Sequence, residues 1–121
     1  MQTIILKQNL ATESATPERC FIIETSNRED RDDRLSIARA RVTPGITTKL
    51  HYVDGEERYI IAEGTGRVEI GDLAPQEVGP GDVVLIPPGV RQRITNVGRV
   101  DLIFYCVCTP RFEQAAYHSL E

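Results

Sequence analysis

Turn-forming residues interrupt this sequence about every ten positions, and this spacing limits the chain to short strands. Between the turns lie runs rich in Val, Ile, Thr and Tyr, which favour extended backbone. These runs are TIIL (3–6), CFIIE (20–24), LSIARARV (35–42), ITTKLHYV (46–53), RYIIAE (58–63), GRVEIG (66–71), DVVLIP (82–87), RQRIT (91–95) and VDLIFYCVC (100–108). Only the tail, 111–121, has a composition that suits a turn or two of helix. The sequence therefore predicts an all-β sandwich or barrel.

The length, the charge and the cysteine content narrow the class of protein further. A chain of 121 residues with a net charge of −4 is expected to form one domain, 1–121, without a basic nucleic-acid-binding face. The start, MQTIILKQNL, lacks the features of a secretory signal, and no apolar run is long enough to cross a membrane. The three cysteines are irregularly spaced, so we expect no disulfide framework and a reducing cytoplasm.

Two strand patterns indicate how the chain covers its apolar surface. In GRVEIG, Val68 and Ile70 alternate with charged residues, which is typical of a strand with one buried face. DVVLIP is apolar throughout, which predicts a strand covered on both faces. In so small a barrel we expect a second copy of the chain to supply part of that cover. The N-terminal TIILK is a candidate for strand exchange in such a homodimer.

The stretch GITTKLHYVDGEERYIIAEG, 45–64, contains the first group of residues that suits a site. Side chains two apart in a strand share a face. Before the DGEE turn one face carries Thr47, Lys49, His51 and Val53, and after it one face carries Glu57, Tyr59 and Ile61. A hairpin at this turn is expected to bring His51 and Glu57 within reach of one ion or one substrate atom.

A second group of residues lies in GDVVLIPPGVRQRITN, 81–96. Gln92 and Ile94 share one strand face, and two arginines share the other. The turn residues of both stretches have structural tasks: Gly45, Gly64 and Gly89 suit positions of positive φ, Pro87 and Pro88 end a strand, and Asn96 suits a turn that closes on its own backbone.

These two stretches resemble the two sequence motifs of the cupin superfamily. The first motif reads glycine, five residues, histidine, one residue, histidine, three or four residues, glutamate, six residues, glycine, and this sequence places there Gly45, His51, Val53, Glu57 and Gly64. The second reads glycine, five residues, proline, one residue, glycine, two residues, histidine, three residues, asparagine, and this sequence places there Gly81, Pro87, Gly89, Gln92 and Asn96. Two of the expected histidines are therefore replaced, one by valine and one by glutamine.

The resemblance covers about residues 35–110 and implies a jelly-roll barrel, the double-stranded β-helix. It also implies a metal site, which in the family uses three histidines and one glutamate. By position, His51, Glu57 and the amide oxygen of Gln92 carry over, whereas Val53 has no donor atom. The cofactor expected from the resemblance is a divalent ion (Mn, Fe, Ni or Zn), with oxygen-rich ligation favouring the harder ions, or none at all.

The resemblance leaves functions of different classes open. The first is a metal-dependent enzyme of isomerase, dioxygenase or lyase type, with Glu57, Tyr59 and Lys49 as candidate catalytic residues for a small polar substrate. The alternative is a metal-free binding or sensing protein, in which His51 and Glu57 can also form an acid–base pair. A structural module with a filled barrel is a third reading. In each, His51 and Gln92 have a plainer interpretation as polar core residues, and Glu57 as an exposed turn residue.

Four further features have no assigned role at this stage. Arg39 and Arg41 share a face that suits an edge, an interface or a pocket wall. Cys106 and Cys108 share a face and suit small core thiols better than a metal pair. The charged run NREDRDDR, 27–34, is typical of a solvated loop, and the second histidine, His118, lies close to the end of the sequence.

Overall fold

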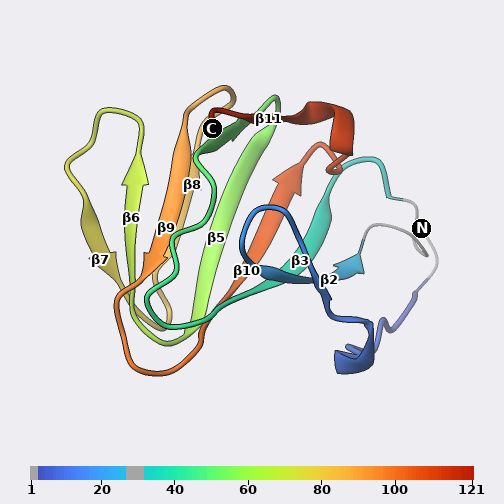
Figure 1. Cartoon of the computed structure of the whole chain (residues 1–121). Coiled ribbons are helices and arrows are strands. Elements are labelled where there is room, and N and C mark those ends of the chain that lie inside the picture. Colours follow the sequence, from blue (N-terminus) through green and yellow to red (C-terminus); the bar gives the residue numbers. More distant parts are fainter. Residues whose placement is uncertain (1–2, 27–31) are drawn as a thin grey trace.

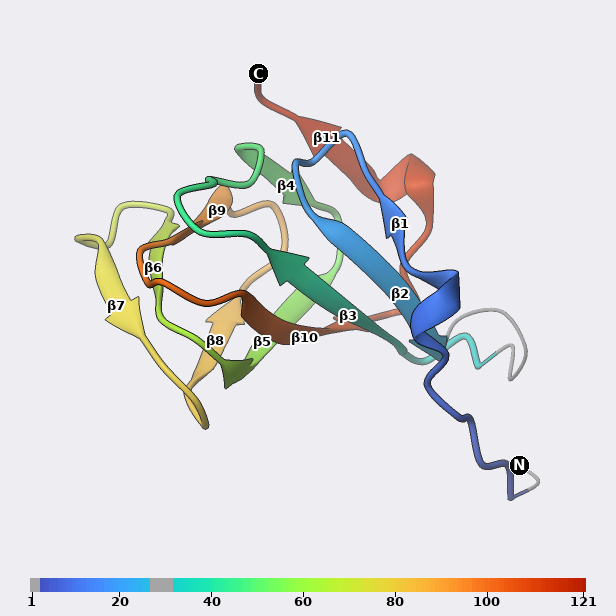
Figure 2. The same ribbon diagram turned by 60° about the horizontal axis from the view of Figure 1, so that its bottom comes forward.

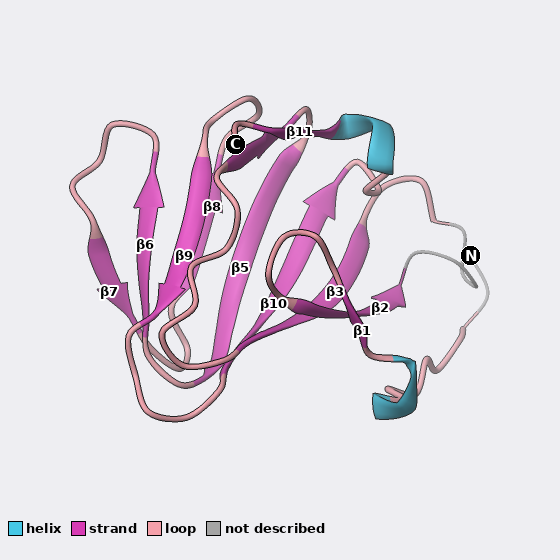
Figure 3. Ribbon diagram, viewed as in Figure 1, coloured by secondary structure: helices cyan, strands magenta, loops and turns pink. Residues whose placement is uncertain are grey.

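The computed structural model describes residues 3–26 and 32–121, and its regular structure is β-strand apart from two short helical turns (Figure 3). One sheet has six strands in the order β1-β2-β3-β10-β5-β8: Ser14–Ala15 (β1), Phe21–Ser26 (β2), Ser36–Val42 (β3), Leu102–Thr109 (β10), Glu56–Glu63 (β5) and Val83–Ile86 (β8). The other has five in the order β11-β4-β9-β6-β7: Tyr117–Ser119 (β11), His51–Val53 (β4), Gln92–Asn96 (β9), Gly66–Ile70 (β6) and Gln76–Val78 (β7). The sheets face each other around a common interior (Figures 1 and 2). The all-β prediction is confirmed.

The long central strands carry most of the six-stranded sheet. β10 pairs antiparallel with β3 on one side and with β5 on the other. Their inward side chains meet those of the five-stranded sheet in an apolar core, whose fully buried members include Val42, Ile61, Ile86, Ile94 and Leu102. The barrel interior is therefore well packed around β5, β6, β8 and β9.

The strand patterns are confirmed in part. Val68 and Ile70 of β6 are buried, as their alternation predicts. In β8, however, only Val84 and Ile86 are buried, while Val83 is 54% exposed and Leu85 61%. A single chain thus covers one face of this edge strand, and the expectation of cover on both faces is wrong for the chain alone. Cover by a second copy stays a prediction.

Three of the expected elements differ from the structure. TIIL forms no strand: residues 3–9 have no regular structure, and the beginning of this stretch extends away from the barrel (Figure 2). ITTKLHYV becomes a regular strand only at His51, although residues 46–50 already lie beside β9, with an isolated bridge between Thr47 and Thr95. The tail forms a 3-10 turn, η2 (Gln114–Ala116), followed by β11, in addition to the N-terminal turn η1 (Leu10–Thr12). The charged run lies outside the described residues at 27–31.

The hairpin predicted between the strands of His51 and Glu57 is wrong. β4 belongs to the five-stranded sheet and β5 to the six-stranded one, so the turn at 54–55 carries the chain from one sheet to the other. Gly55 permits this tight crossing, since a Cβ there would lie 2.9 Å from the carbonyl oxygen of Thr109. The two strands therefore face each other across the interior, which still brings both side chains to one place.

The turn residues behave as the sequence predicts. Gly45, Gly64 and Gly89 all have positive φ, and Asn96 accepts a hydrogen bond from the Gly98 N–H at 2.9 Å. At Gly64 the constraint is also spatial, because a Cβ would lie 2.7 Å from the Asp101 carbonyl oxygen. In the described part of the chain, neither helical turn has the length or apolar character needed to span a bilayer.

Candidate functional site

One end of the barrel interior contains a cavity in place of the packed core. It lies between β2, β3, β5 and β10 of one sheet and β4 and β11 of the other, and about 100 Å³ of it is open to the centres of water molecules. Its ionisable or hydroxylic lining residues are Glu18, Glu24, Ser36, Thr48, His51, Glu57, Tyr59 and Tyr117. The remaining lining is aliphatic, aromatic or thiol. The cavity thus combines an apolar wall with a few polar groups, as binding sites for small molecules do.

His51 projects from the start of β4 into this cavity and is 5% exposed. Its Nδ1 lies 2.8 Å from the carbonyl oxygen of Lys49. Because a carbonyl oxygen can only accept, Nδ1 carries a proton, and Nε2 is the nitrogen that can bind or release a second one. The ring stacks on Tyr117 with centroids 4.7 Å apart. These contacts orient Nε2 as the reactive nitrogen of the site.

Glu57 approaches from the opposite sheet, on β5, and is 7% exposed. It pairs in register with Cys108 of β10, whose thiol donates to Oε2 at 3.5 Å. The other oxygen, Oε1, has no hydrogen-bond partner. Burial raises the pKa of this carboxyl above its ordinary value, although the neighbouring Gln92 amide and His51 act in the opposite direction. Glu57 is therefore a buried acceptor with unused capacity, not an exposed turn residue.

Gln92, on β9, is fully buried and lies in register with His51. The hydroxyl of Tyr59 donates a hydrogen bond to its Oε1, whereas its Nε2 has no partner. The amide oxygen that the sequence predicts as a metal ligand is thus already engaged. Tyr59 lines the cavity, and burial raises the pKa of its hydroxyl well above the ordinary range, so it remains a donor.

Glu18 is a residue of the site that the sequence analysis missed. The turn before β2 is closed by a hydrogen bond from the Thr16 N–H to the Cys20 carbonyl at 2.9 Å, and it presents Glu18 to the cavity. Glu18 Oε1 lies 4.0 Å from His51 Nε2. Burial raises its pKa, and the charge of His51 and the nearby Tyr117 hydroxyl lower it. No motif marks this position, because Glu18 lies in a loop that precedes the two motif stretches.

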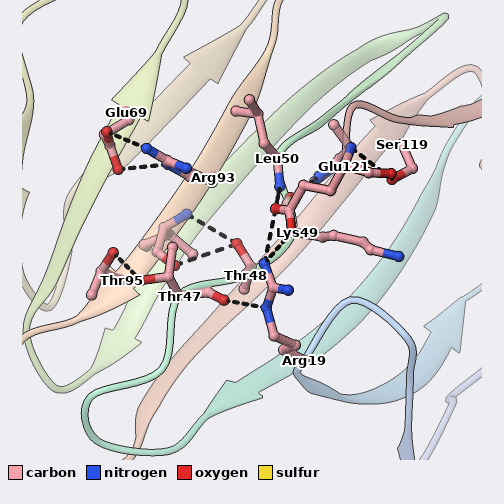
Figure 4. A network of polar contacts seen from close by, with 12 residues as sticks. Arg19, Thr47, Thr48, Lys49, Leu50, Glu69, Arg93, Thr95, Ser119 and Glu121 are labelled. Atoms are coloured by element: carbon pink, nitrogen blue, oxygen red, sulfur yellow. Dashed lines mark hydrogen bonds and ion pairs between the residues drawn. The ribbon is translucent and has the colours of Figure 1, made fainter.

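The last strand, β11, closes the cavity and was also missed. Tyr117 of β11 lies over His51, and Glu121 beyond it holds the segment in place. The Arg19 guanidinium donates to Glu121 at 2.8 Å, and Glu121 Oε2 accepts the Leu50 N–H at 2.6 Å (Figure 4). Arg19 has φ of 69°, a left-handed conformation that is costly for a residue with a Cβ. Its contacts with Glu121 offset that strain.

The three cysteines all line the same cavity, and all are free thiols. Burial raises the pKa of Cys20 to about 11 and raises those of Cys106 and Cys108 further. The thiols are therefore neutral, and Cys106 and Cys108 share a face as the sequence predicts. The absence of a disulfide framework is confirmed.

Several predicted residues lie away from the cavity. Thr48 lines it in place of Thr47, and the Lys49 side chain does not line it, because the strand alternation begins only at His51. Arg39 and Arg41 form ion pairs with Glu13, at 3.1 and 2.6 Å.

His118 also lies outside the cavity, although it belongs to the strand that closes it. Its Nε2 lies 2.9 Å from Asp54 Oδ1, and its ring stacks on Tyr52. The second histidine of the chain therefore contributes to the packing of β11 against β4.

The donors present do not make up the four-ligand metal set that the resemblance implies. His51 Nε2 and Glu57 Oε1 are available, Val53 offers nothing, and Gln92 Oε1 accepts from Tyr59. Within residues 3–26 and 32–121, no group of three or more His, Cys, Asp and Glu side chains is arranged to hold an ion. What the arrangement offers chemically is an imidazole lone pair beside two carboxyl groups of raised pKa, which suits proton exchange with a bound molecule.

Comparisons with known proteins agree with this architecture. A family model described as "Cupin domain" matches residues 38–108. Oxalate decarboxylase from Bacillus subtilis superposes with a TM-score of 0.82 at 21% identity, covering 99% of this chain and 33% of that one. A protein described as a predicted oxalate decarboxylase from Thermotoga maritima gives 0.78 at 22% identity, covering 88% and 99%.

A third solved structure, the plu4264 protein from Photorhabdus luminescens, gives a TM-score of 0.77 at 19% identity, covering 95% of this chain and 92% of that one. No curated protein matches the sequence significantly. At these identities the solved structures show the fold alone, which is the predicted jelly-roll barrel. This chain spans only about a third of the Bacillus enzyme.

Proposed function

Because the chain belongs to the cupin family, we propose that its barrel cavity binds a small organic molecule directly, through Glu18, His51 and Glu57, without a resident metal ion. The observation that carries this proposal is the carboxyl of Glu57, which is buried at the wall of an open cavity and whose Oε1 makes no hydrogen bond of standard geometry, although the Gln92 amide lies close to the carboxyl. A buried polar atom left without a partner costs about 1–3 kcal/mol of stability. A ligand that donates a hydrogen bond there recovers that energy, and this is the physical reason for binding.

The contact between Tyr59 and Gln92 supports direct binding over metal coordination. To coordinate an ion, the Gln92 oxygen would have to share or give up the hydrogen bond from Tyr59. A neutral amide is also a weaker donor than the imidazole that the family has at this position. Gln92 and Tyr59 together act as a positioning pair, which fixes the cavity wall behind Glu57.

Metal titration tests this proposal. We expect no bound metal after purification and no rise in Tm with Mn²⁺, Fe²⁺, Ni²⁺ or Zn²⁺. The test is sensitive, because an ion that did bind would stabilise the protein by about 2.7 kcal/mol at 100 times its Kd. The double variant Val53→His and Gln92→His supplies both absent imidazoles, and we expect it to gain metal binding. Recovery of a stoichiometric metal that His51→Ala removes and His118→Ala keeps would contradict the proposal and favour the metal-dependent alternative.

We also propose that the protein is a homodimer, as the sequence suggests. Ile60 of β5 lies in register with Val83 of β8, and with Leu85 they leave an apolar surface on the outside of the sheet. A second copy is the expected cover. Light scattering should give twice the chain mass, and Leu85→Lys should shift it toward the monomer. A monomeric native protein would contradict this.

A further inference from the structure

We propose that the molecule bound in this cavity is a small organic cation, a protonated amine with a compact apolar body; this inference rests on the proposed function, which makes the cavity a site for a small molecule. Three observations support it: the sign of the charges around the cavity, the hydrogen-bonding capacity of its unpartnered atoms, and the character of its walls.

The charges that line the cavity are negative. Glu18 and Glu57 line it together with His51, and among the described residues that do so there is no arginine or lysine. An incoming carboxylate would meet the carboxyl groups of Glu18 and Glu57 and no guanidinium, which is the usual partner for such a group. The cavity is therefore expected to bind small organic acids poorly.

The arginines of β3 have their own partners on the other face of the six-stranded sheet. Ala38 and Ala40 of β3 line the cavity, and Arg39 and Arg41 alternate with them, so the arginines point outward. Arg39 pairs with Glu13, and Arg41 pairs with Glu13 and with Asp101 at 3.2 Å. Neither can neutralise an anion inside the barrel without crossing the sheet.

The unused polar atoms that face the cavity favour a donor ligand. Glu57 Oε1 has room for a further hydrogen bond, and neutral His51 offers the lone pair of Nε2, because Nδ1 donates to the Lys49 carbonyl. Glu18 lies next to Nε2 at 4.0 Å. An ammonium group carries three donors and no acceptor, and its charge strengthens each hydrogen bond to a carboxylate.

The rest of the wall suits a compact hydrocarbon group. It includes Ala38, Ala40, Val53, Phe104, Phe112 and Tyr117. Aromatic rings also attract a nearby cation through their negative faces. The open volume of about 100 Å³ limits the ligand to a few carbon atoms beyond its charged group.

Three probes that share an isobutyl group test the sign of the charge directly: isobutylammonium, isobutanol and isovalerate. Methyl NMR spectra report binding inside the cavity through the signals of Ala38, Ala40 and Val53. We expect isobutylammonium to shift these signals and to bind at least ten times more tightly than isovalerate, with isobutanol in between. Ala38→Leu, which fills the cavity, should weaken the binding of the cation and the alcohol.

A charge-removing variant with a matched control sharpens this test. Glu57→Gln keeps the shape of the side chain, and we expect it to weaken isobutylammonium binding about tenfold while changing isobutanol binding little. Glu63→Gln, on the exposed end of the same strand, should change neither. If Glu57→Gln does not fold, as judged by its NMR spectrum, Glu18→Gln makes the same comparison.

The possible outcomes separate the two proposals. Isovalerate binding as tightly as isobutylammonium, with shifts at the same methyl groups, would overturn the cation proposal and leave the small-molecule function intact. Each probe is added up to about 100 mM, which would detect even the weak binding expected of ligands of this size. If none of the three shifts these methyl signals, both the cation proposal and the small-molecule function are contradicted.

Discussion

The two halves of the barrel interior share the long strands β3, β5 and β10 but are packed in opposite ways. Around β6, β8 and the middle of β9 the interior is filled by aliphatic side chains, which include Ile70, Ile86 and Ile94. Around β4 and β11 the interior is open and is lined by Glu57, whose Oε1 makes no hydrogen bond of standard geometry. Polar groups buried in this state destabilise a fold. The difference indicates that one half is packed for stability and the other retains a binding site at the expense of stability.

The largest expected effect comes from a truncation in the packed half. Ile94→Ala removes a fully buried side chain from the apolar core, and we expect a loss of about 2–5 kcal/mol in the free energy of unfolding. Urea denaturation measures it.

A matched pair of valines on the five-stranded sheet then tests the comparison itself. Val68→Ala lies in the packed half and Val53→Ala at the cavity wall. We expect Val53→Ala to cost less, because that side chain already borders open space and loses fewer contacts. Equal losses would show that the two halves are packed alike.

The next effect has the opposite sign. Glu57→Met replaces the buried carboxyl by an apolar side chain of similar length, and we expect it to stabilise the protein by about 1 kcal/mol while abolishing binding of the cationic probe. Chemical denaturation and the methyl NMR titration measure the two effects separately. Glu63→Met, at an exposed position of the same strand, should leave both within error. Destabilisation by Glu57→Met would mean that the carboxyl supports the fold, and the contrast between the halves would fail.

The sequence predicts the barrel and its packed half better than it predicts the residues of the open half. The turn glycines, Asn96 and the alternation in β6 indicate the barrel, because strand periodicity and positive φ are local properties. The convergence of His51, Glu57 and Gln92 also follows from motif spacing, although through opposite sheets instead of a hairpin. Glu18 and Tyr117 could not be predicted, because each reaches the cavity through tertiary contacts of a loop and a short edge strand. Nor could the Tyr59 hydrogen bond that engages Gln92.

A smaller effect distinguishes charges outside the barrel from those inside. Glu13 lies on the outer face of the six-stranded sheet, and its hydrogen bonds with Arg41 hold its pKa below the ordinary value of 4.5. A carboxyl whose folded-state pKa is lowered stabilises the fold above its unfolded pKa, and this contribution is lost as the pH falls through the folded pKa. We therefore expect the acid limb of native stability, below about pH 5, to be less steep in Glu13→Gln.

The magnitude at neutral pH should be about 1 kcal/mol or less, because the pair lies near the surface. Urea denaturation at a series of pH values measures the slope, with Glu63→Gln as the control. If the pH dependence of stability is unchanged in Glu13→Gln, the outer ion pairs do not stabilise the fold. Paired carboxyls outside the barrel and buried carboxyls inside it would then differ less in their effect on stability than the structure indicates.

The smallest effect concerns the segment that closes the open half. Glu121→Gln keeps an oxygen for the Leu50 N–H but loses the charge that pairs with Arg19, so we expect only a small global loss of stability. The local effect should be larger, since β11 has only β4 as a neighbour in its sheet and its opening uncovers His51 without unfolding the core. Hydrogen exchange should therefore accelerate at Tyr117–Ser119 and stay unchanged in β6 and β9. Glu113→Gln, exposed before η2, is the control. If exchange rises equally in both halves, the cavity end is not an independently opening unit, and ligand entry must take another route.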